Sequence, residues 1–358
     1  MRDEDARSTE RARPRRLTAI LRQAGARAGL YATELQLLIA LAALYAVFAA
    51  VRPSTFATWS NADNMARVGA ILVVIAIGQA FALIVGGFDI SVGANAGFVS
   101  VVIALVANEH GGLEVGIPVG LAAGLLIGLV NGFFIARLRV NPFVVTLGML
   151  TFLIGLGNQI AGGASVATLS SSYRWFGANH WGPLPSSVCI AAIVLAVAWF
   201  VLDRSRLGLY IYSIGGSRDT ARLAGAPVVR YEILAYGICG LLAGVGGMIL
   251  GSQTTVGQAE LGASYEVRSI AAAVIGGAVI GGGVGRLSGV VMGAALLAVL
   301  QTGLDISNVN EYIQRTITGI VLVLAVVVSQ LRVGSFKDLA QILGMGGLRR
   351  SLPGRGVA

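Results

Sequence analysis

Charged residues are scarce in this chain. They make up 12% of its 358 residues, and 56% of the residues are hydrophobic. A soluble domain of this length would carry roughly a quarter charged residues. The balance excludes a soluble enzyme with a simple anchor, and it predicts an all-α polytopic membrane protein.

Side chains suited to catalysis or metal binding are equally rare. The chain has two cysteines and two histidines. Cys189 and Cys239 fall in apolar runs, whereas His110 and His180 fall in expected loops. Four isolated residues offer neither a disulfide framework nor a metal cluster. We therefore expect no catalytic residue and no metal ligand here.

A nucleotide-binding motif is also missing. Residues 276–285 read GGAVIGGGVG, which looks like a phosphate-binding loop. A P-loop requires GxxxxGK[ST], but the only lysine, Lys337, is followed by Asp338. These glycines instead predict a tight turn between two spans. We expect no cofactor bound by this chain.

What the chain does contain is ten apolar runs. About 20 such residues cross the hydrocarbon core as a helix. The runs are 34–51, 65–85, 93–107, 115–135, 142–162, 187–202, 231–250, 267–283, 287–304 and 314–331. They define a transmembrane domain, 34–331, between a cytoplasmic N-terminal tail, 1–33, and a cytoplasmic C-terminal tail, 332–358.

The basic residues predict how the chain is oriented. With the N-terminus inside, 21 of the 26 Lys and Arg residues fall on the inner side. The five outside are Arg52, Arg67, Arg174, Arg268 and Arg315. Basic residues concentrate in cytoplasmic loops, so both termini and the loop 203–230 are predicted to be cytoplasmic.

That loop carries the signals of a short helix over 218–224. Ser217 suits the N-cap, Asp219 complements the dipole in the first turn, Gly225 suits the left-handed position after the end, and Pro227 blocks continuation. Such a helix is a handle for a soluble partner, although an ordinary solvated connector remains an alternative. The candidate residues for coupling to such a partner are Ser217, Arg218, Asp219, Arg222, Leu223 and Gly225.

The chain also resembles itself. Residues 85–90 (VGGFDI) align with 256–261 (VGQAEL) at an offset of 171, which pairs Asp89 with Glu260. An offset of five spans reverses orientation, so the similarity predicts an inverted five-plus-five repeat, a common plan for transporters. Chance similarity in a glycine-rich chain is the alternative.

Glycines recur at every fourth position of one span. They are Gly116, Gly120, Gly124, Gly128 and Gly132. Such a stripe lets a neighbouring helix approach closely, so we predict tight packing along it.

Polar residues inside the apolar region are the candidates for a translocation path, because they are costly there. The stretch 86–93, GGFDISVG, predicts an interrupted helix. Asp89 is expected either to face a cavity or partner segment, or to cap a helix. The candidates for the path or its gating are Asp89, Ser91, Asn131, Asn141, Thr146, Gln253 and Glu260; Asn158 and Gln159 add further amides. This largely neutral set favours a hydroxylated solute over an ion.

Four motifs carry a resemblance to a known family. They are GGFDISVG, NGFFIARLRVNPFVVTLGML (131–150), GGSRDTARLAGAPV (215–228) and AAAVIGGAVIGGGVGRLSGVVMGA (271–294). In this order they resemble the permease subunits of bacterial ATP-binding cassette (ABC) importers for ribose and related monosaccharides. The chain departs from the family pattern at two places: 301–303 (QTG), where members often have a variable residue followed by Asn-Gly, and 278–280 (AVI), which replaces a more polar stretch.

The resemblance implies a transport subunit rather than an enzyme. Two permeases, identical or different, would pair in the bacterial inner membrane with two ATPase subunits, which hold ATP and Mg. A periplasmic binding protein would deliver a monosaccharide or polyol, and helix 218–224 would rest on the ATPase. The implied fold is a bundle of about ten spans, similar to the vitamin B12 importer, in contact with lipid and not with nucleic acid. A stand-alone secondary transporter or channel for a small hydroxylated solute is the alternative.

Overall fold

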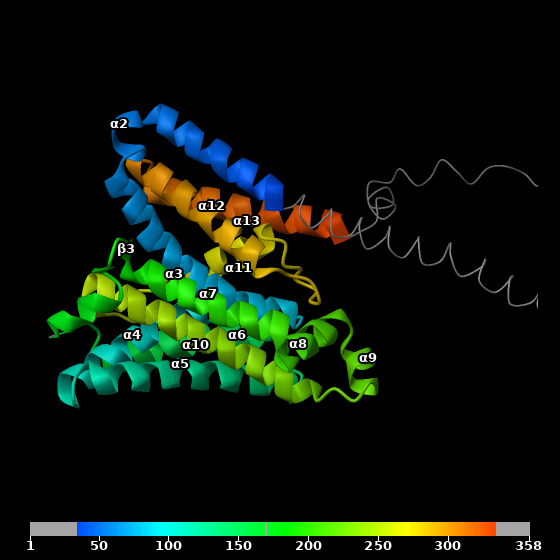
Figure 1. Cartoon of the computed structure of the whole chain (residues 1–358). Helices are drawn as coiled ribbons and strands as arrows, with labels where there is room; N and C mark the ends of the chain where they lie inside the picture. Colours follow the sequence, from blue (N-terminus) through cyan, green and yellow to red (C-terminus); the bar gives the residue numbers. More distant parts are fainter. Residues whose placement is uncertain (1–33, 169, 334–358) are drawn as a thin grey trace, which may run out of the picture.

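Long apolar helices run the length of the molecule, as the hydrophobic runs predict (Figure 1). The computed structural model describes residues 34–168 and 170–333. Its helices are Glu34–Val51, α2 (Pro53–Phe56), α3 (Trp59–Ile84), α4 (Val92–Glu109), α5 (Leu113–Ala136), α6 (Pro142–Ile160), α7 (Ser186–Arg204), α8 (Arg206–Gly216), α9 (Arg218–Leu223), α10 (Val228–Thr254), α11 (Tyr265–Ile275), α12 (Leu287–Ile306) and α13 (Glu311–Val333).

Short extended and 3-10 segments lie between the helices. Strand β1 (Val166–Ala167) pairs antiparallel with β4 (Val256–Gly257), and β2 (His180–Trp181) pairs with β3 (Leu184–Pro185). The 3-10 helix η1 (Ser171–Phe176) lies between β1 and β2 in the chain.

Eight helices of the described chain are long and apolar enough to cross a membrane. They coincide with eight of the ten predicted spans, so the prediction of an all-α polytopic protein is confirmed at that level. The helix at the tenth position, α13, is 23 residues long and is not among the eight.

The eighth predicted span, 267–283, is wrong in its extent. Its helix, α11, has only 11 residues and ends at Ile275. The chain leaves the helix there because Gly277, two residues after its end, takes a φ angle of 94°, a region that glycine enters without steric cost. Further along the same turn, Gly282 and Gly283 take φ angles of 87° and 74°. The predicted tight turn at 276–285 is therefore confirmed.

Helices α3 and α10 form the centre of the bundle. Their best membrane-crossing windows are 83% and 72% buried, whereas that of helix Glu34–Val51 is 6% buried. The predicted glycine stripe of α5 lies against this centre: Gly124 and Gly128 contact the backbone of α10 at Gly240. Close packing along that stripe is confirmed.

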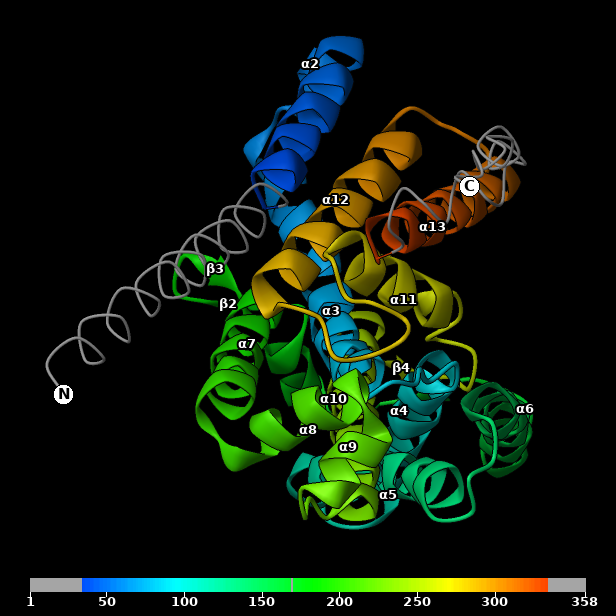
Figure 2. The same cartoon turned by 90° about the vertical axis from the view of Figure 1, so that its right-hand side faces the viewer.

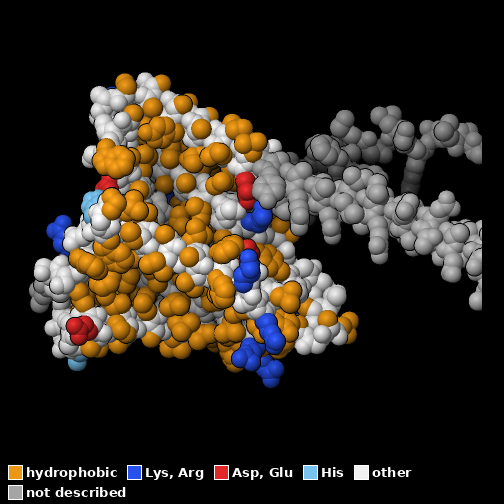
Figure 3. All heavy atoms as spheres, in the orientation of Figure 1, with side chains coloured by type: hydrophobic (Ala, Val, Ile, Leu, Met, Phe, Trp, Pro, Cys, Tyr) orange, Lys and Arg blue, Asp and Glu red, His pale blue; other side chains and the backbone are white. Residues whose placement is uncertain are grey.

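The bundle has two different ends (Figure 1). One carries α8, α9, the glycine turn 276–285, and the first and last described residues; we call it the α9 end, and it faces the viewer in Figure 2. The other carries α2 and the short strands and is the strand end. On the face in Figure 3, most basic side chains gather at the α9 end.

The two predicted tails lie almost entirely outside the residues that the structure describes. Residues 1–33 and 334–358 are not described. The C-terminal tail was expected to begin at 332, but α13 continues to Val333.

Candidate functional site

Helix α9 forms where its capping residues predict. The Ser217 hydroxyl accepts a hydrogen bond from the backbone N–H of Thr220 at 3.3 Å. At the other end, Gly225 has a φ of 84°, and its N–H donates to the Arg222 carbonyl at 3.0 Å. The helix ends at Leu223, one residue earlier than expected. The capped helix is therefore confirmed as local structure.

One face of α9 is open to solvent. Leu223 is 85% exposed, and the exposed side chains of Arg222 and Asp219 lie 3.6 Å apart at their charged atoms. An exposed leucine next to a pair of opposite charges, on a helix that projects from the bundle (Figure 1), is a surface suited to a soluble partner.

Arg218 points the other way. Its Nε lies 2.8 Å from Glu232 Oε1, and its Nη2 donates to Glu232 Oε2 at 2.8 Å and to the Ala136 carbonyl at 3.1 Å. Arg218, one of the predicted coupling residues, is thus turned inward to α10 and α5, and its coupling role stays a prediction.

The sequence did not predict helix α8, whose residues fall in the predicted loop 203–230. Ser205 caps it by accepting hydrogen bonds from the N–H groups of Leu207 and Gly208. Ile211 and Ile214, three residues apart, are buried on one face. That spacing is the signal by which α8 could have been found.

A glycine junction joins α8, the end of α3 and the glycine turn. The Gly283 N–H donates to the Ile84 carbonyl at 2.8 Å. A Cβ placed on Gly282 would lie 2.8 Å from the Cα of Gly86 and 2.9 Å from the Cα of Gly215. Three separate segments therefore meet here with their backbones in close contact, and the Tyr212 hydroxyl of α8 also donates to the Gly285 carbonyl at 2.8 Å.

Asp89 sits just beyond this junction, in a buried polar cluster. Its Oδ1 accepts from the N–H and the hydroxyl of Ser91 at 2.7 and 2.6 Å, and its Oδ2 accepts from Asn131 Nδ2 at 3.1 Å. Asn131 also donates to the Ser91 hydroxyl at 3.0 Å. All three side chains are at most 1% exposed.

Both expectations for Asp89 hold in part. Its carboxylate fixes the turn that precedes α4, as a cap would, and it binds a neighbouring span through Asn131 of α5. Burial raises the pKa of the Asp89 carboxyl, and the hydrogen bonds from Ser91 and Asn131 oppose that rise. These three residues bond to one another and hold the segment before α4 against α5, and their role in the path or its gating stays a prediction.

The other predicted path residues lie apart from this cluster. Asn141 caps α6 by accepting from the Phe143 N–H at 2.9 Å. Thr146 is buried and donates to the Pro142 carbonyl at 2.8 Å. Gln253, half-buried, is near the end of α10, and Glu260 is exposed in the segment between β4 and α11. The predicted set is thus not one constellation.

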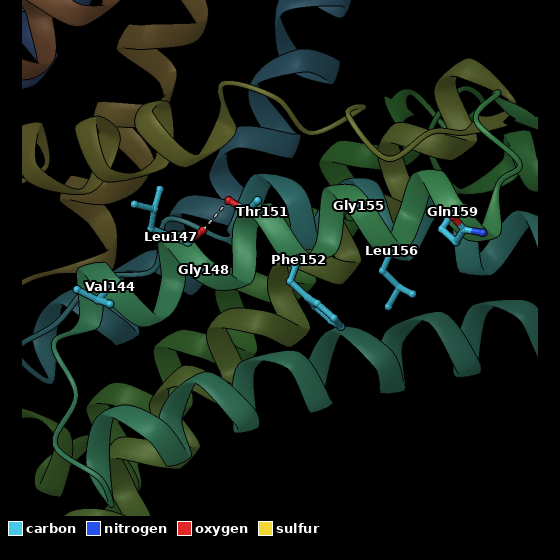
Figure 4. A pocket seen from close by; sticks show the side chains of 8 residues that line it. All are labelled: Val144, Leu147, Gly148, Thr151, Phe152, Gly155, Leu156 and Gln159. Atoms are coloured by element: carbon cyan, nitrogen blue, oxygen red, sulfur yellow. Dashed lines mark hydrogen bonds between the residues drawn. The ribbon is translucent and has the colours of Figure 1, made fainter.

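Helix α6 has an open, unpacked face that the sequence did not predict. Within α6, only Thr146, Leu153 and Gly157 are buried. A shallow hollow runs along its open side (Figure 4), where Gly148, Thr151, Gly155 and Gln159 are exposed on one helical face. Their separations of three and four residues were visible in the sequence, but nothing there marks that face as unpacked.

The segment that carries Glu260 lies beside α6. A Cβ placed on Gly157 would lie 2.9 Å from the Cβ of Ala259. Elsewhere in the described part of the chain, no three His, Cys, Asp or Glu side chains are grouped so that they could hold a metal ion.

The fold is that of a polytopic all-α membrane protein, with glycine-packed helices and a capped helix projecting from one end. The chain matches the family described as "Branched-chain amino acid transport system / permease component" over residues 61–326, and it belongs to this family. No solved structure matches the chain at a significant level.

Three relatives of the chain are named as sugar permeases. The ribose import permease of Escherichia coli K12 is 34% identical over 299 residues, covering 82% of this chain and 93% of that protein. The L-arabinose transport system permease of the same strain is 34% identical over 291 residues, 81% of this chain and 88% of that protein. Its D-allose permease is 31% identical over 301 residues, 81% of this chain and 90% of that protein.

Proposed function

We propose that this chain is the membrane subunit of an ATP-driven importer, and that it carries a monosaccharide or similar polyol delivered by a periplasmic binding protein. The observation that carries the proposal is α9, a capped helix with Leu223 exposed at one end of a bundle that has no ATP-binding motif of its own. The named substrates of the relatives, ribose, L-arabinose and D-allose, support the sugar class.

The ATPase would dock on the exposed face of α9. Asp219 and Arg222 would contact polar groups of the ATPase, and Leu223 would enter an apolar groove. ATP and Mg would be held by that subunit and not by this chain.

The α9 end would face the cytoplasm of a bacterium and the strand end the periplasm. The gathering of basic side chains at the α9 end supports this orientation. Both ends of the described chain lie at that same end, which supports cytoplasmic termini and an even number of crossings.

A second permease copy would cover the open face of α6. Small residues such as Gly148 and Gly155 allow close helix approach in a membrane, and Thr151 and Gln159 are costly if they face lipid. The sugar path would then run between the two copies, with Glu260 near its periplasmic mouth and the Asp89 cluster holding a gating segment.

The two halves would form an inverted repeat. The offset of 171 residues carries α5, 113–136, onto 284–307, and α12 spans Leu287–Ile306. The same offset carries α6, 142–160, onto 313–331, and α13 spans Glu311–Val333. These coincidences of bounds support the repeat.

Uptake by the assembled transporter is the test. The chain is reconstituted in liposomes with the ATPase and binding protein encoded beside it, and uptake of labelled ribose, arabinose and allose is measured with and without ATP. We expect ATP-dependent uptake of at least one of them. Uptake of leucine alone would instead favour the substrate class in the family's description, and sugar uptake without ATPase would favour a channel or secondary transporter.

A further inference from the structure

Helix α9 has little that ties it to the rest of the protein. It has six residues, and Ala221 is the one that is buried. The other polar contacts of its side chains are local: Thr220 with Ser217 and Arg222 with Asp219. The backbone joins α9 to α8 at Ser217 and to α10 through residues 224–227, and a polar side-chain contact would add a direct connection from α9 to the spans.

Arg218 is that connection within the described residues. Its guanidinium meets both carboxylate oxygens of Glu232, in the second turn of α10, at 2.8 Å, and its Nη2 also reaches the carbonyl of Ala136, the last residue of α5. A planar guanidinium with five donors can hold a carboxylate and a carbonyl together, which an ammonium group does less well.

Both acceptors suit a cation. The Ala136 carbonyl belongs to the last turn of α5, where carbonyl groups lack intrahelical partners and the helix dipole is negative. Glu232 is 8% exposed, so its carboxylate is removed from water and depends on its partners. Arg139, in the link between α5 and α6, also acts electrostatically on Glu232.

The two helices that Arg218 reaches are themselves tightly joined. A Cβ placed on Gly128 of α5 would lie 3.0 Å from the Cα of Gly240 in α10. Because backbone packs on backbone there, α5 and α10 are expected to move as one unit.

We infer that Arg218 and Glu232 form the joint through which a displacement of α9 reaches α5 and α10. The inference rests on the proposed coupling role of α9. Arg218 is therefore a positioning residue: it contacts neither the ATPase nor the sugar, and it converts contact at α9 into movement of two membrane spans.

Reversal of the ion pair tests the joint in the complete importer with its ATPase and binding protein. In Arg218→Glu and in Glu232→Lys, two like charges face each other. We expect the number of sugars carried per ATP hydrolysed to fall about tenfold, within the range usual for coupling between two sites. The double variant Arg218→Glu/Glu232→Lys rebuilds the pair with reversed polarity, and we expect it to recover to within about threefold of the original ratio.

The ratio of transport to hydrolysis separates coupling from stability, since a protein that merely folds poorly loses both together. Arg218→Lys keeps the positive charge but not the planar guanidinium with its several donors, and we expect an intermediate ratio of sugars carried per ATP. Arg315→Glu is the matched control, because Arg315 and Glu311 form an exposed pair of similar distance, 2.7 Å, on α13; its ratio is expected to stay unchanged.

Two results would overturn the inference. One is a normal ratio in both single variants, and the other is a double variant no better than the worse single one. Cross-linking of a Leu223→Cys variant to the ATPase tests docking at α9 separately from the Arg218–Glu232 joint. If the cross-link forms and charge reversal leaves the number of sugars carried per ATP unchanged, the joint is refuted and the docking role of α9 stands. If no cross-link forms, the docking role fails and the joint fails with it.

Discussion

Gly128 of α5 and Gly240 of α10 pack backbone against backbone. A Cβ placed on Gly240 would lie 2.7 Å from the Cα of Gly128, closer than real side-chain carbons come to other atoms. This contact joins a glycine stripe, recognisable in the sequence, to one of the two most buried spans.

Gly240→Ala is expected to destabilise the protein by about 1–3 kcal/mol, the usual effect of overpacking a close contact. Thermal unfolding in detergent measures it. Gly319→Ala is the matched control, since a Cβ on Gly319 would meet nothing within 4 Å, and alanine there is expected to be neutral or stabilising because it favours the helix. Equal melting temperatures for the two variants would contradict the packing argument.

Removing the Asp89 carboxylate is expected to weaken the fold. Asp89→Ala leaves the buried Ser91 hydroxyl without its acceptor, which costs about 1–3 kcal/mol, and removes one of the two acceptors of the Asn131 amide. The yield of folded, monodisperse protein and its melting temperature would both fall.

Glu260→Gln is the companion variant. Its side chain is exposed and makes no hydrogen bond with other described residues, so we expect normal assembly together with reduced uptake. Loss of assembly in Glu260→Gln, with assembly unchanged in Asp89→Ala, would reverse the roles proposed for the two acids.

Gly225→Val is expected to uncouple transport from ATP hydrolysis. Its φ of 84° lies in the left-handed region, where a residue with a Cβ costs roughly 1–2 kcal/mol, so the end of α9 would rearrange. Gly216→Ala serves as control, because Gly216 has open space around it. Uptake per ATP is measured in both variants, and an unchanged ratio in Gly225→Val would argue against coupling through α9.

Labelling with a membrane-impermeant thiol reagent tests the orientation. In a background in which Cys189 and Cys239 are replaced, Leu223→Cys is expected to react only from the cytoplasm and Glu260→Cys only from the periplasm. Labelling of Cys at 260 from the cytoplasm alone would refute both the orientation and the inverted repeat.

Cross-linking tests the open face of α6. In the same cysteine-free background, Thr151→Cys is expected to form a disulfide between two permease copies, which requires Cα atoms within about 7 Å. Ile193→Cys on α7 is the control: Ile193 is also exposed, but we expect it to face lipid and to stay reduced. A disulfide at 193 and none at 151 would place the interface on α7.

The sequence predicted the parts of this structure that depend on local chemistry. Apolar length located eight spans, and Ser217, Gly225 and Pro227 located α9 to within one residue. These signals work because capping and helix length act between residues close in the chain.

What the sequence could not provide was the direction in which side chains face. Arg218 and Arg222 look alike on a short basic helix, yet the first is bound to α10 and the second is exposed. Asp89, Ser91 and Asn131 come together because α5 returns beside α4, whereas Gln253 and Glu260 do not join them. Such pairings depend on tertiary packing, which no local pattern encodes.

The glycine junction has a mechanical consequence. Side chains usually absorb small shifts between packed segments by changing rotamer, but Gly86, Gly215 and Gly282 have none to change. We therefore expect a shift of α8 at this point to displace the backbone at the end of α3, next to the segment held by Asp89. The junction would then carry a displacement from α8 to α3 by direct contact between backbones, because no side chains separate them at these glycines.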